Sequence, residues 1–260
     1  MLTIAHISDL HCGGPHFVPN LLERAISEVN DLAPEIVICS GDLTSFGFKQ
    51  EYAEAKRYLD SIRCESVVVI PGNHDSRNVG YVHFEELFGS RNSVLHRDRV
   101  SIVAVDSTEP DLDHGQIGRG RYGWIEEQFA APADLRIFVL HHHLLPVPGT
   151  GRERNIVYDA GDLIECLQHS GVNLVLSGHK HVPYAWRLEN MFIVNAGTVS
   201  SMRLRGNTRQ CYNVIEIEDG RVDVWRQYPF HGRERIIEFS LETLDYRKYT
   251  RRIEREVTTR

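Results

Sequence analysis

Short apolar runs alternate with amphipathic segments over the first two-thirds of this 260-residue chain. The runs are nearly continuous in Val, Ile and Leu, a pattern typical of strands that are covered on both faces. They span residues 2–7, 35–40, 66–70, 100–105, 135–140 and 172–176. The segments between them place apolar residues three and four positions apart, which predicts helices over residues 20–32, 50–62, 122–130 and 162–169. Strands and helices that alternate in this way predict an α/β fold.

The last third of the chain has a different pattern, in which strand candidates follow one another directly. They span residues 191–195, 212–218 and 221–227, and Glu218-Asp219-Gly220 is a hairpin signal between the last two. Residues 236–241 are a further strand candidate, and the apolar spacing over residues 245–257 predicts a helix. Because the chain shows no repeat and no long Pro/Gly/Ser linker, we expect a single domain over residues 1–260, with 236–260 as a C-terminal strand and helix extension.

Composition excludes several classes of protein. Apolar residues make up 42% and charged residues 25%, enough to bury a core without disulfides. No apolar run approaches the roughly 20 residues of a membrane span, and the chain does not open with a signal-peptide pattern. The five cysteines form no C-x-x-C pair. We therefore expect a cytoplasmic protein with reduced thiols and no membrane contact.

The net charge of −7 restricts the kinds of partner that we expect. It disfavours a broad basic surface, and with it nucleic acid as a partner. The predicted C-terminal helix nevertheless carries five basic residues, Arg247, Lys248, Arg251, Arg252 and Arg255. A solvated helical face is the ordinary interpretation of such a run, and a nucleic-acid contact is the alternative.

Histidines and carboxylates follow the ends of five predicted strands. These segments are Asp9-Leu10-His11, Gly41-Asp42, Gly72-Asn73-His74-Asp75, His141-His142-His143 and Gly178-His179-Lys180-His181. A single histidine beside a strand is ordinarily a core or surface residue, and a single Gly-Asp is ordinarily a turn. Five such segments at one edge of a sheet, where α/β proteins bind ligands, are a much stronger signal. The sequence therefore predicts a metal site at the carboxyl ends of the strands.

The ligand types restrict the metal. Imidazole and carboxylate without thiolate suit Mn, Fe, Zn, Co or Ni, and Cys12 has no second cysteine placed to join it. The seven donors are too many for one ion of four to six ligands, and they fit two ions that share one carboxylate. They are Asp9, His11, Asp42, Asn73, a histidine of the run 141–143, His179 and His181.

These five blocks together resemble the signature of calcineurin-like metallophosphoesterases. The segments His6-Ile7-Ser8-Asp9-Leu10-His11, Ser40-Gly41-Asp42-Leu43-Thr44 and Pro71-Gly72-Asn73-His74-Asp75 are most similar to the class III cyclic-nucleotide phosphodiesterases. The resemblance spans residues 9–181, with a weaker match at Gly197-Thr198, Arg203 and Arg205. It implies a two-sheet β-sandwich flanked by helices, with the active site at the C-terminal ends of the strands.

The resemblance also implies a role for each position. Asp9, His11 and His181 would hold one divalent or trivalent ion (Mn, Fe, Zn or Co), and Asn73, His141 and His179 a second. Asp42 would bridge the two ions. His74 would act on the leaving oxygen or stabilise the transition state, while a metal-activated hydroxide attacks phosphorus. The expected substrate is a small phosphodiester, with a cyclic nucleotide as the first candidate.

Other interpretations remain open at this stage. Glycerophosphodiesters or nucleotide-linked lipid precursors would use the same residues, and a DNA nuclease or a non-catalytic protein-binding scaffold are further alternatives. The oligomeric state is open as well, a homodimer being one possibility.

Several residues are candidates for substrate contacts rather than for metal binding. The family commonly reads His-His-Pro-Pro where this chain has His141-His142-His143-Leu144, so His142 and His143 either face the substrate or lie on the surface. Arg77, Arg203 and Arg205 either clamp the phosphate or form surface ion pairs, and His114 is a candidate pocket residue. Asp75 either orients His74 or caps the next helix.

Overall fold

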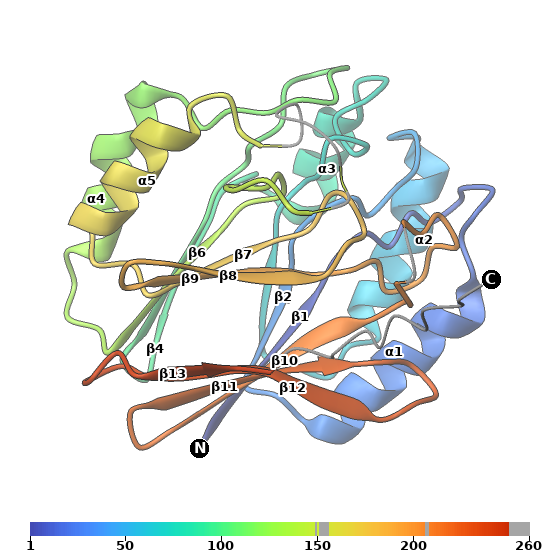
Figure 1. The fold of residues 1–260 in the computed structure, drawn as a ribbon. Coiled ribbons are helices and arrows are strands. Elements are labelled where there is room, and N and C mark those ends of the chain that lie inside the picture. Colours follow the sequence, from blue (N-terminus) through green and yellow to red (C-terminus); the bar gives the residue numbers. More distant parts are fainter. Residues whose placement is uncertain (149, 151–155, 206–207, 250–260) are drawn as a thin grey trace, which may run out of the picture.

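Two β-sheets pack face to face, with helices on their outer sides (Figure 1). The computed structural model describes residues 1–148, 150, 156–205 and 208–249. Within these residues the first sheet has seven strands, in the order β13 (Tyr246–Lys248), β12 (Arg233–Ser240), β11 (Arg221–Gln227), β10 (Tyr212–Glu218), β1 (Leu2–Ile7), β2 (Ile36–Cys39) and β3 (Ser66–Val69). The second sheet has six, in the order β4 (Ser93–Arg97), β5 (Val100–Ala104), β6 (Leu135–Val139), β7 (Leu174–Ser177), β9 (Met191–Asn195) and β8 (Tyr184–Leu188).

Strand direction brings the predicted site segments to one edge. In the first sheet β1, β2 and β3 are parallel, and in the second β5, β6, β7 and β9 are parallel. Strands β10 to β13 form an antiparallel meander beside β1, and Glu218-Asp219-Gly220 lies at the β10–β11 hairpin, as the sequence predicts. The α/β two-sheet sandwich is therefore confirmed.

The core follows from the two-residue period of the strands. In β1, Ile4 faces the interior between the sheets, while Ala5 and Ile7 pack against helices. The interior cluster takes apolar side chains from both sheets, for example Ile38 from β2 and Val139 from β6. Because both faces of these strands are covered, their sequences are nearly continuous in apolar residues.

Helices α1 (Pro19–Leu32), α2 (Lys49–Asp60) and α3 (Gly80–Phe88) lie on the side of the first sheet (Figure 1). Helices α4 (Tyr122–Phe129) and α5 (Ala160–His169) cover the second sheet, and a short 3-10 turn, η1 (Arg119–Arg121), precedes α4. Helix α1 begins at a proline and ends before Ala33, whose φ is 49°. No helix in the described residues is long and apolar enough to cross a membrane.

The structure corrects the predicted helix over residues 245–257. Residues 246–248 form strand β13, which pairs antiparallel with β12, and residues 250–260 lie outside the described part. The reason is packing, since the Tyr246 ring lies 5.8 Å from Phe192 and the Arg187 guanidinium lies 4.6 Å from the Tyr246 ring. A single domain over residues 1–260 stays a prediction.

Candidate metal centre

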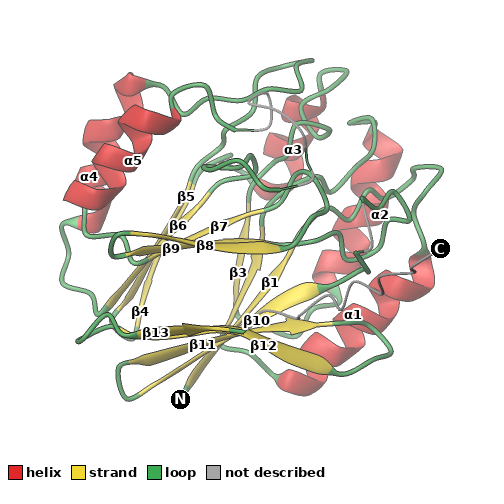
Figure 2. Cartoon of the chain, in the orientation of Figure 1, coloured by secondary structure: helices red, strands yellow, loops and turns green. Residues whose placement is uncertain are grey.

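The loops that follow β1, β2, β3, β6 and β7 gather at one edge of the sandwich (Figure 2). Backbone bonds join them within each sheet: Asp9 N donates to Gly41 O at 2.9 Å, and Gly178 N donates to His141 O at 3.0 Å. Across the sheets, His179 N donates to both carboxylate oxygens of Asp9, at 3.1 and 3.0 Å. The site is therefore part of the seam where the two sheets meet.

Many of the predicted ligands have left-handed backbone conformations. The φ angles of Asp9, His11, Asp42, His179 and His181 are 55°, 54°, 53°, 83° and 59°. Such conformations cost a non-glycine residue about 1–3 kcal/mol each, and they cluster at functional sites. Here they turn each side chain back into the seam directly after its strand ends.

One group of donors surrounds the first predicted metal position. His11 Nε2 lies 2.9 Å from His181 Nε2, and His181 Nε2 lies 3.3 Å from Asp9 Oδ1. Asp42 Oδ2 completes the group at 3.6 Å from His11 Nε2. Donors about 2.1 Å from one ion lie roughly 3.0 Å apart when they are adjacent in an octahedron. The spacing in this group therefore fits a single ion.

A second group lies on the other side of Asp42. His141 Nε2 is 3.4 Å from Asp42 Oδ1 and 3.2 Å from Asn73 Oδ1. His179 Nδ1 is 2.9 Å from the same Asn73 oxygen. Since Oδ1 of Asp42 faces this group and Oδ2 faces the first, one carboxylate is shared between two donor sets.

The charges of the buried groups depend on one another. Burial alone would raise the pKa of Asp42, but His141 and His74 hold it well below its usual range. Burial would lower the pKa of His141, but Asp42 and Asp9 raise it to about 9. Burial lowers the pKa of His11 to about 3. Ionised carboxylates and neutral imidazoles are suited to a cation, and His141 would give up its proton when one binds.

The outer nitrogens of two histidines fix their tautomers. His141 Nδ1 donates to Ser40 O at 2.8 Å, and His181 Nδ1 donates to Arg203 O at 2.5 Å. Each ring then turns its Nε2 towards the donor group, which is the usual arrangement of a metal-binding histidine. The donor set therefore fits two metal ions, with Asp42 between them.

Asp75 has neither of the two roles considered from the sequence. Its carboxylate accepts hydrogen bonds from Leu43 N, Thr44 N, Thr44 Oγ1 and Gly72 N, at 2.7–3.0 Å. Helix α3 begins only at Gly80, and its N-cap is Val79. Asp75 instead ties the loop after β2 to the loop after β3, since these bonds connect the two segments that supply Asp42 and Asn73.

His74 lies beside the first donor group. Its Nδ1 donates to Ser45 O at 2.6 Å, and its backbone N donates to Asp42 Oδ1 at 2.9 Å. The ring meets that of His11 edge-on, with centroids 4.8 Å apart. With Nδ1 occupied, Nε2 is the nitrogen of His74 that is free to exchange a proton with a ligand.

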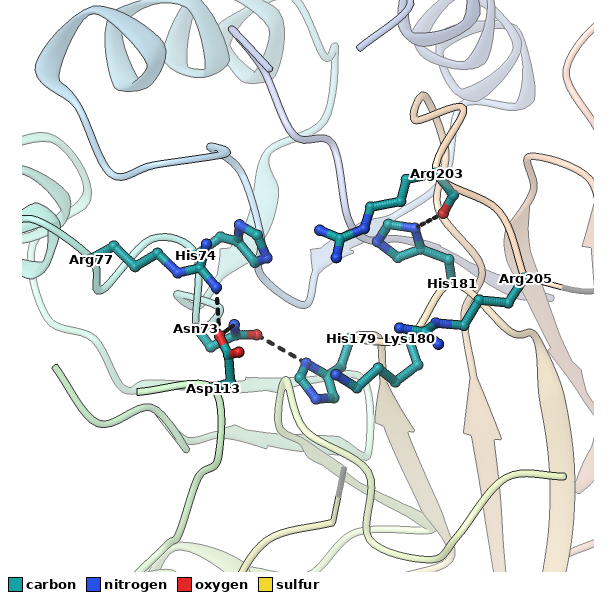
Figure 3. Close-up of a pocket in the computed structure, with 9 residues that line it drawn as sticks. All are labelled: Asn73, His74, Arg77, Asp113, His179, Lys180, His181, Arg203 and Arg205. Carbon is teal, nitrogen blue, oxygen red and sulfur yellow. Dashed lines mark hydrogen bonds and ion pairs between the residues drawn. The ribbon is translucent and has the colours of Figure 1, made fainter. Parts of the chain in front are cut away.

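A hollow opens over the centre, and Figure 3 shows the side chains that line it. They are Asn73, His74, Arg77, Asp113, His179, Lys180, His181, Arg203 and Arg205. The three arginines of the sequence analysis are therefore at the hollow. Sequence reasoning assigned no role to Lys180 or Asp113, although the position of Lys180 between two ligand candidates was a usable signal.

His142 and His143 are neither surface residues nor part of this lining. Both are fully buried, and the Nδ1 of His142 lies 2.8 Å from Ser107 Oγ. A Cβ on Gly115 would lie 2.4 Å from that Nδ1, so the backbone of this loop covers His142. The structure thus places His142 beneath this loop and outside the lining of the hollow, and its contact with a substrate stays a prediction.

The structure also places His114 and Cys12, two further residues considered from the sequence. His114 is exposed and does not line the hollow, where its neighbour Asp113 does. Cys12 packs in the apolar cluster beneath α1 and α2, and burial raises the pKa of its thiol. It is a core residue.

The geometry agrees with comparisons between this chain and known proteins. The family model described as calcineurin-like phosphoesterase matches residues 2–183. The chain belongs to this family. Its donor groups also supply what the family's dinuclear chemistry requires, namely two sets of O and N ligands that share a carboxylate.

Two curated bacterial proteins show how far the similarity extends. A "Probable cyclic nucleotide phosphodiesterase" of Rhodococcus erythropolis is 29% identical over 159 residues, which cover 57% of this chain and 52% of that protein. A protein of the same description from Xenorhabdus bovienii is 26% identical over 82% of this chain and 81% of its own length. The match therefore spans about half of the first relative and most of the second.

Among solved structures, a purple acid phosphatase from yellow lupin seeds has a similar fold. The TM-score is 0.71 at 15% sequence identity, over 89% of this chain and 52% of the lupin chain. This likeness agrees with the two-sheet architecture.

Proposed function

We propose that the protein is a metal-dependent phosphodiesterase that hydrolyses a small substrate, with cyclic nucleotides as the first candidates. The observation that carries the proposal is the pair of donor groups that share Asp42. Asp9, His11 and His181 would hold one ion, and Asn73, His141 and His179 the other. Bound there, two such ions would lower the pKa of water and neutralise the phosphate oxygens.

The protein's own residues would complete the reaction. The bond from His74 Nδ1 to Ser45 O fixes the ring, so that Nε2 can give a proton to the departing oxygen. Arg77 lies beside it at the hollow and pairs with Asp113. The Arg77 guanidinium would orient the phosphate rather than move a proton, because it stays charged.

The relatives named as cyclic nucleotide phosphodiesterases support this class of substrate. The narrow hollow agrees with a small molecule, and the net charge of −7 argues against a nuclease. A protein-binding scaffold would not need the seven donors that come together here. A cytoplasmic location and a homodimer stay predictions.

The test begins with protein that has been stripped of metal and reloaded with Mn, Fe, Zn or Co. It is assayed on bis(p-nitrophenyl) phosphate and on p-nitrophenyl phosphate, then on 3′,5′- and 2′,3′-cyclic nucleotides and on a glycerophosphodiester. We expect metal-dependent cleavage of the diester. Cleavage of the monoester alone would refute the phosphodiesterase proposal, and the last three substrates separate the candidate classes.

A further inference from the structure

The hollow over the metal centre is unusually basic for a chain of net charge −7. Arg77, Lys180, Arg203 and Arg205 line it, and Asp113 is the one carboxylate among the described lining residues. These cations do not belong to the donor groups. Their arrangement therefore indicates which groups the substrate carries in addition to its scissile bond.

The basic residues divide between two sides of the hollow. Arg77 lies beside His74 and pairs with Asp113, whose carboxylate also accepts a bond from Asn73 Nδ2 at 3.3 Å. Lys180, Arg203 and Arg205 lie opposite, near His179 and His181 (Figure 3). We call these three residues the basic wall. Among the described residues, no carboxylate forms an ion pair with a basic-wall side chain, and Asp113 and Asp42 act on Lys180 only at longer range.

The basic wall is attached to the metal centre by short connections. Arg203 O accepts the bond from His181 Nδ1, and Arg203 N donates to Ser201 Oγ at 3.1 Å. The preceding Met202 N donates to His16 O at 2.8 Å. Lys180 lies between His179 and His181 in the chain. The backbone of the wall is therefore held at the edge of the site.

A simple diester does not account for this charge. A phosphodiester carries one negative charge, whereas two divalent ions keep a formal +2 beside Asp9 and Asp42. The centre can neutralise such a substrate without help from the wall. Three further cations in one place are suited to a phosphoryl group of their own, since guanidinium groups bind phosphate oxygens in pairs.

We propose that the substrate carries a second phosphoryl group, which the basic wall binds while the scissile diester lies on the metal centre. The inference rests on the proposed function, because that function places the diester. The hollow is open to solvent and lies directly over the donor groups, since Asn73, His179 and His181 line it. The substrate class is thus a small phosphodiester with an additional phosphate, such as a cyclic nucleotide that is also phosphorylated on its sugar, or a nucleoside diphosphate ester.

The first test measures binding, so that it does not depend on turnover. Metal-loaded protein is titrated calorimetrically with AMP, ADP and adenosine 3′,5′-bisphosphate. We expect at least one of the two-phosphate nucleotides to bind about tenfold more tightly than AMP or better, as charge-assisted hydrogen bonds allow. Equal affinity for all three nucleotides would overturn the inference.

Variants then connect the preference to the wall. Arg205→Gln and Arg203→Gln should each weaken the preferred two-phosphate nucleotide by about tenfold more than they weaken AMP. Arg209→Gln is the matched control, because Arg209 is exposed on the same segment and does not line the hollow. Equal weakening of AMP and the two-phosphate nucleotide would mean that the wall holds a single phosphate, and would also overturn the inference.

A kinetic measurement separates this inference from the proposed function. Thymidine 5′-(p-nitrophenyl phosphate) and its 3′-phosphorylated form carry the same scissile diester. If the protein binds two-phosphate nucleotides selectively but cleaves neither compound nor bis(p-nitrophenyl) phosphate, the proposed function is refuted, whereas the phosphate-binding role of the basic wall is supported. If it cleaves bis(p-nitrophenyl) phosphate but shows no preference for a second phosphate in binding, the role of the basic wall is refuted and the proposed function is supported.

Discussion

His74 lies beside the first donor group, and its predicted role is that of a proton donor and not of a metal ligand. Its backbone contacts Asp42, its Nδ1 is held by Ser45 O, and its ring edge meets His11. We predict that His74→Ala keeps both metal ions but lowers kcat on bis(p-nitrophenyl) phosphate by about 10²–10⁴, the usual contribution of a positioned acid. Metal content by mass spectrometry and steady-state kinetics measure the two effects.

The control for this variant is His96→Ala, because His96 is exposed on β4 and does not line the hollow. It should match the wild type in metal content and rate. Wild-type turnover in His74→Ala would contradict the proposed proton donor. Loss of metal would instead show that His74 is needed to hold an ion.

His6 gives a residue-scale prediction for pH. It is fully buried between Asn213, whose Nδ2 lies 3.2 Å from His6 Nδ1, and Ser40, whose Oγ lies 2.9 Å from Nε2. Burial lowers its pKa from 6.5 to about 3. Below pH 6.5 the unfolded chain therefore binds a proton that the folded protein excludes, so stability is lost as pH falls from 6.5 towards 3.

The expected size of this pH effect follows from the uptake of one proton on unfolding. In metal-free protein, the free energy of unfolding of the wild type should fall more steeply than that of His6→Gln, by up to about 1.4 kcal/mol per pH unit between pH 6 and 4. Urea unfolding at several pH values measures both slopes, and the other buried histidines cancel in the difference. Equal slopes would show that His6 is protonated in the folded state.

Site residues could be found from the sequence where they directly follow a strand, as Asp9, Asp42 and His179 do. The parallel strand order then brings them to one edge. His142 shows the limit of this reasoning. It stands next to a ligand candidate, but the loop that contains Gly115 buries it, and that loop is remote in sequence.

At the scale of elements, the loops after β2 and β3 act as one unit because Asp75 joins them. We predict that Asp75→Asn lowers the free energy of unfolding by about 1–3 kcal/mol, since an amide nitrogen would replace an acceptor oxygen among buried donors. Urea denaturation of metal-free protein measures the change. Asp60→Asn, at the exposed end of α2, is the control and should change stability by less than about 0.5 kcal/mol. A similar small effect of Asp75→Asn would mean that the loops are held by other contacts.

Most helices and strands could be predicted from local sequence patterns. For those that could not, the failure has a physical reason. Helix α1 has a clear apolar face of Leu22, Ala25, Ile26 and Val29. Helix α3 lacks one, since only Gly80 and Phe84 are buried in it and no side chain caps its start. Strand β13 looks helical by its spacing but pairs with β12, because neighbouring strands decide the structure of so short a segment.

At the scale of the whole molecule, the donor groups connect the two sheets. Asp9, His11 and Asp42 come from the first sheet, and His141, His179 and His181 come from the second. Ions that bind only the folded protein should therefore raise its melting temperature. We predict an upward shift on metal loading, worth about 2.7 kcal/mol at a free metal concentration one hundred times the Kd.

Asp42→Asn tests this connection because Asp42 faces both groups. It should lose most of the metal-induced shift, while Asp60→Asn keeps it. Differential scanning calorimetry with and without metal provides the measurement. A full shift in Asp42→Asn would argue that the stabilising ions bind elsewhere.

The sequence by itself determined the α/β class and the positions of the main strands along the chain, and it predicted the seven donors, because each of these depends on local periodicity or on residues adjacent to a strand end. Tertiary structure alone decided which predicted donors lie together, the burial of His142, the contacts of Asp75 and the collection of Lys180, Arg203 and Arg205 on one side of the hollow. The reason is that these properties depend on distances between segments up to 170 residues apart, such as the one that holds His11 and His181. Only the packing of the two sheets sets those distances.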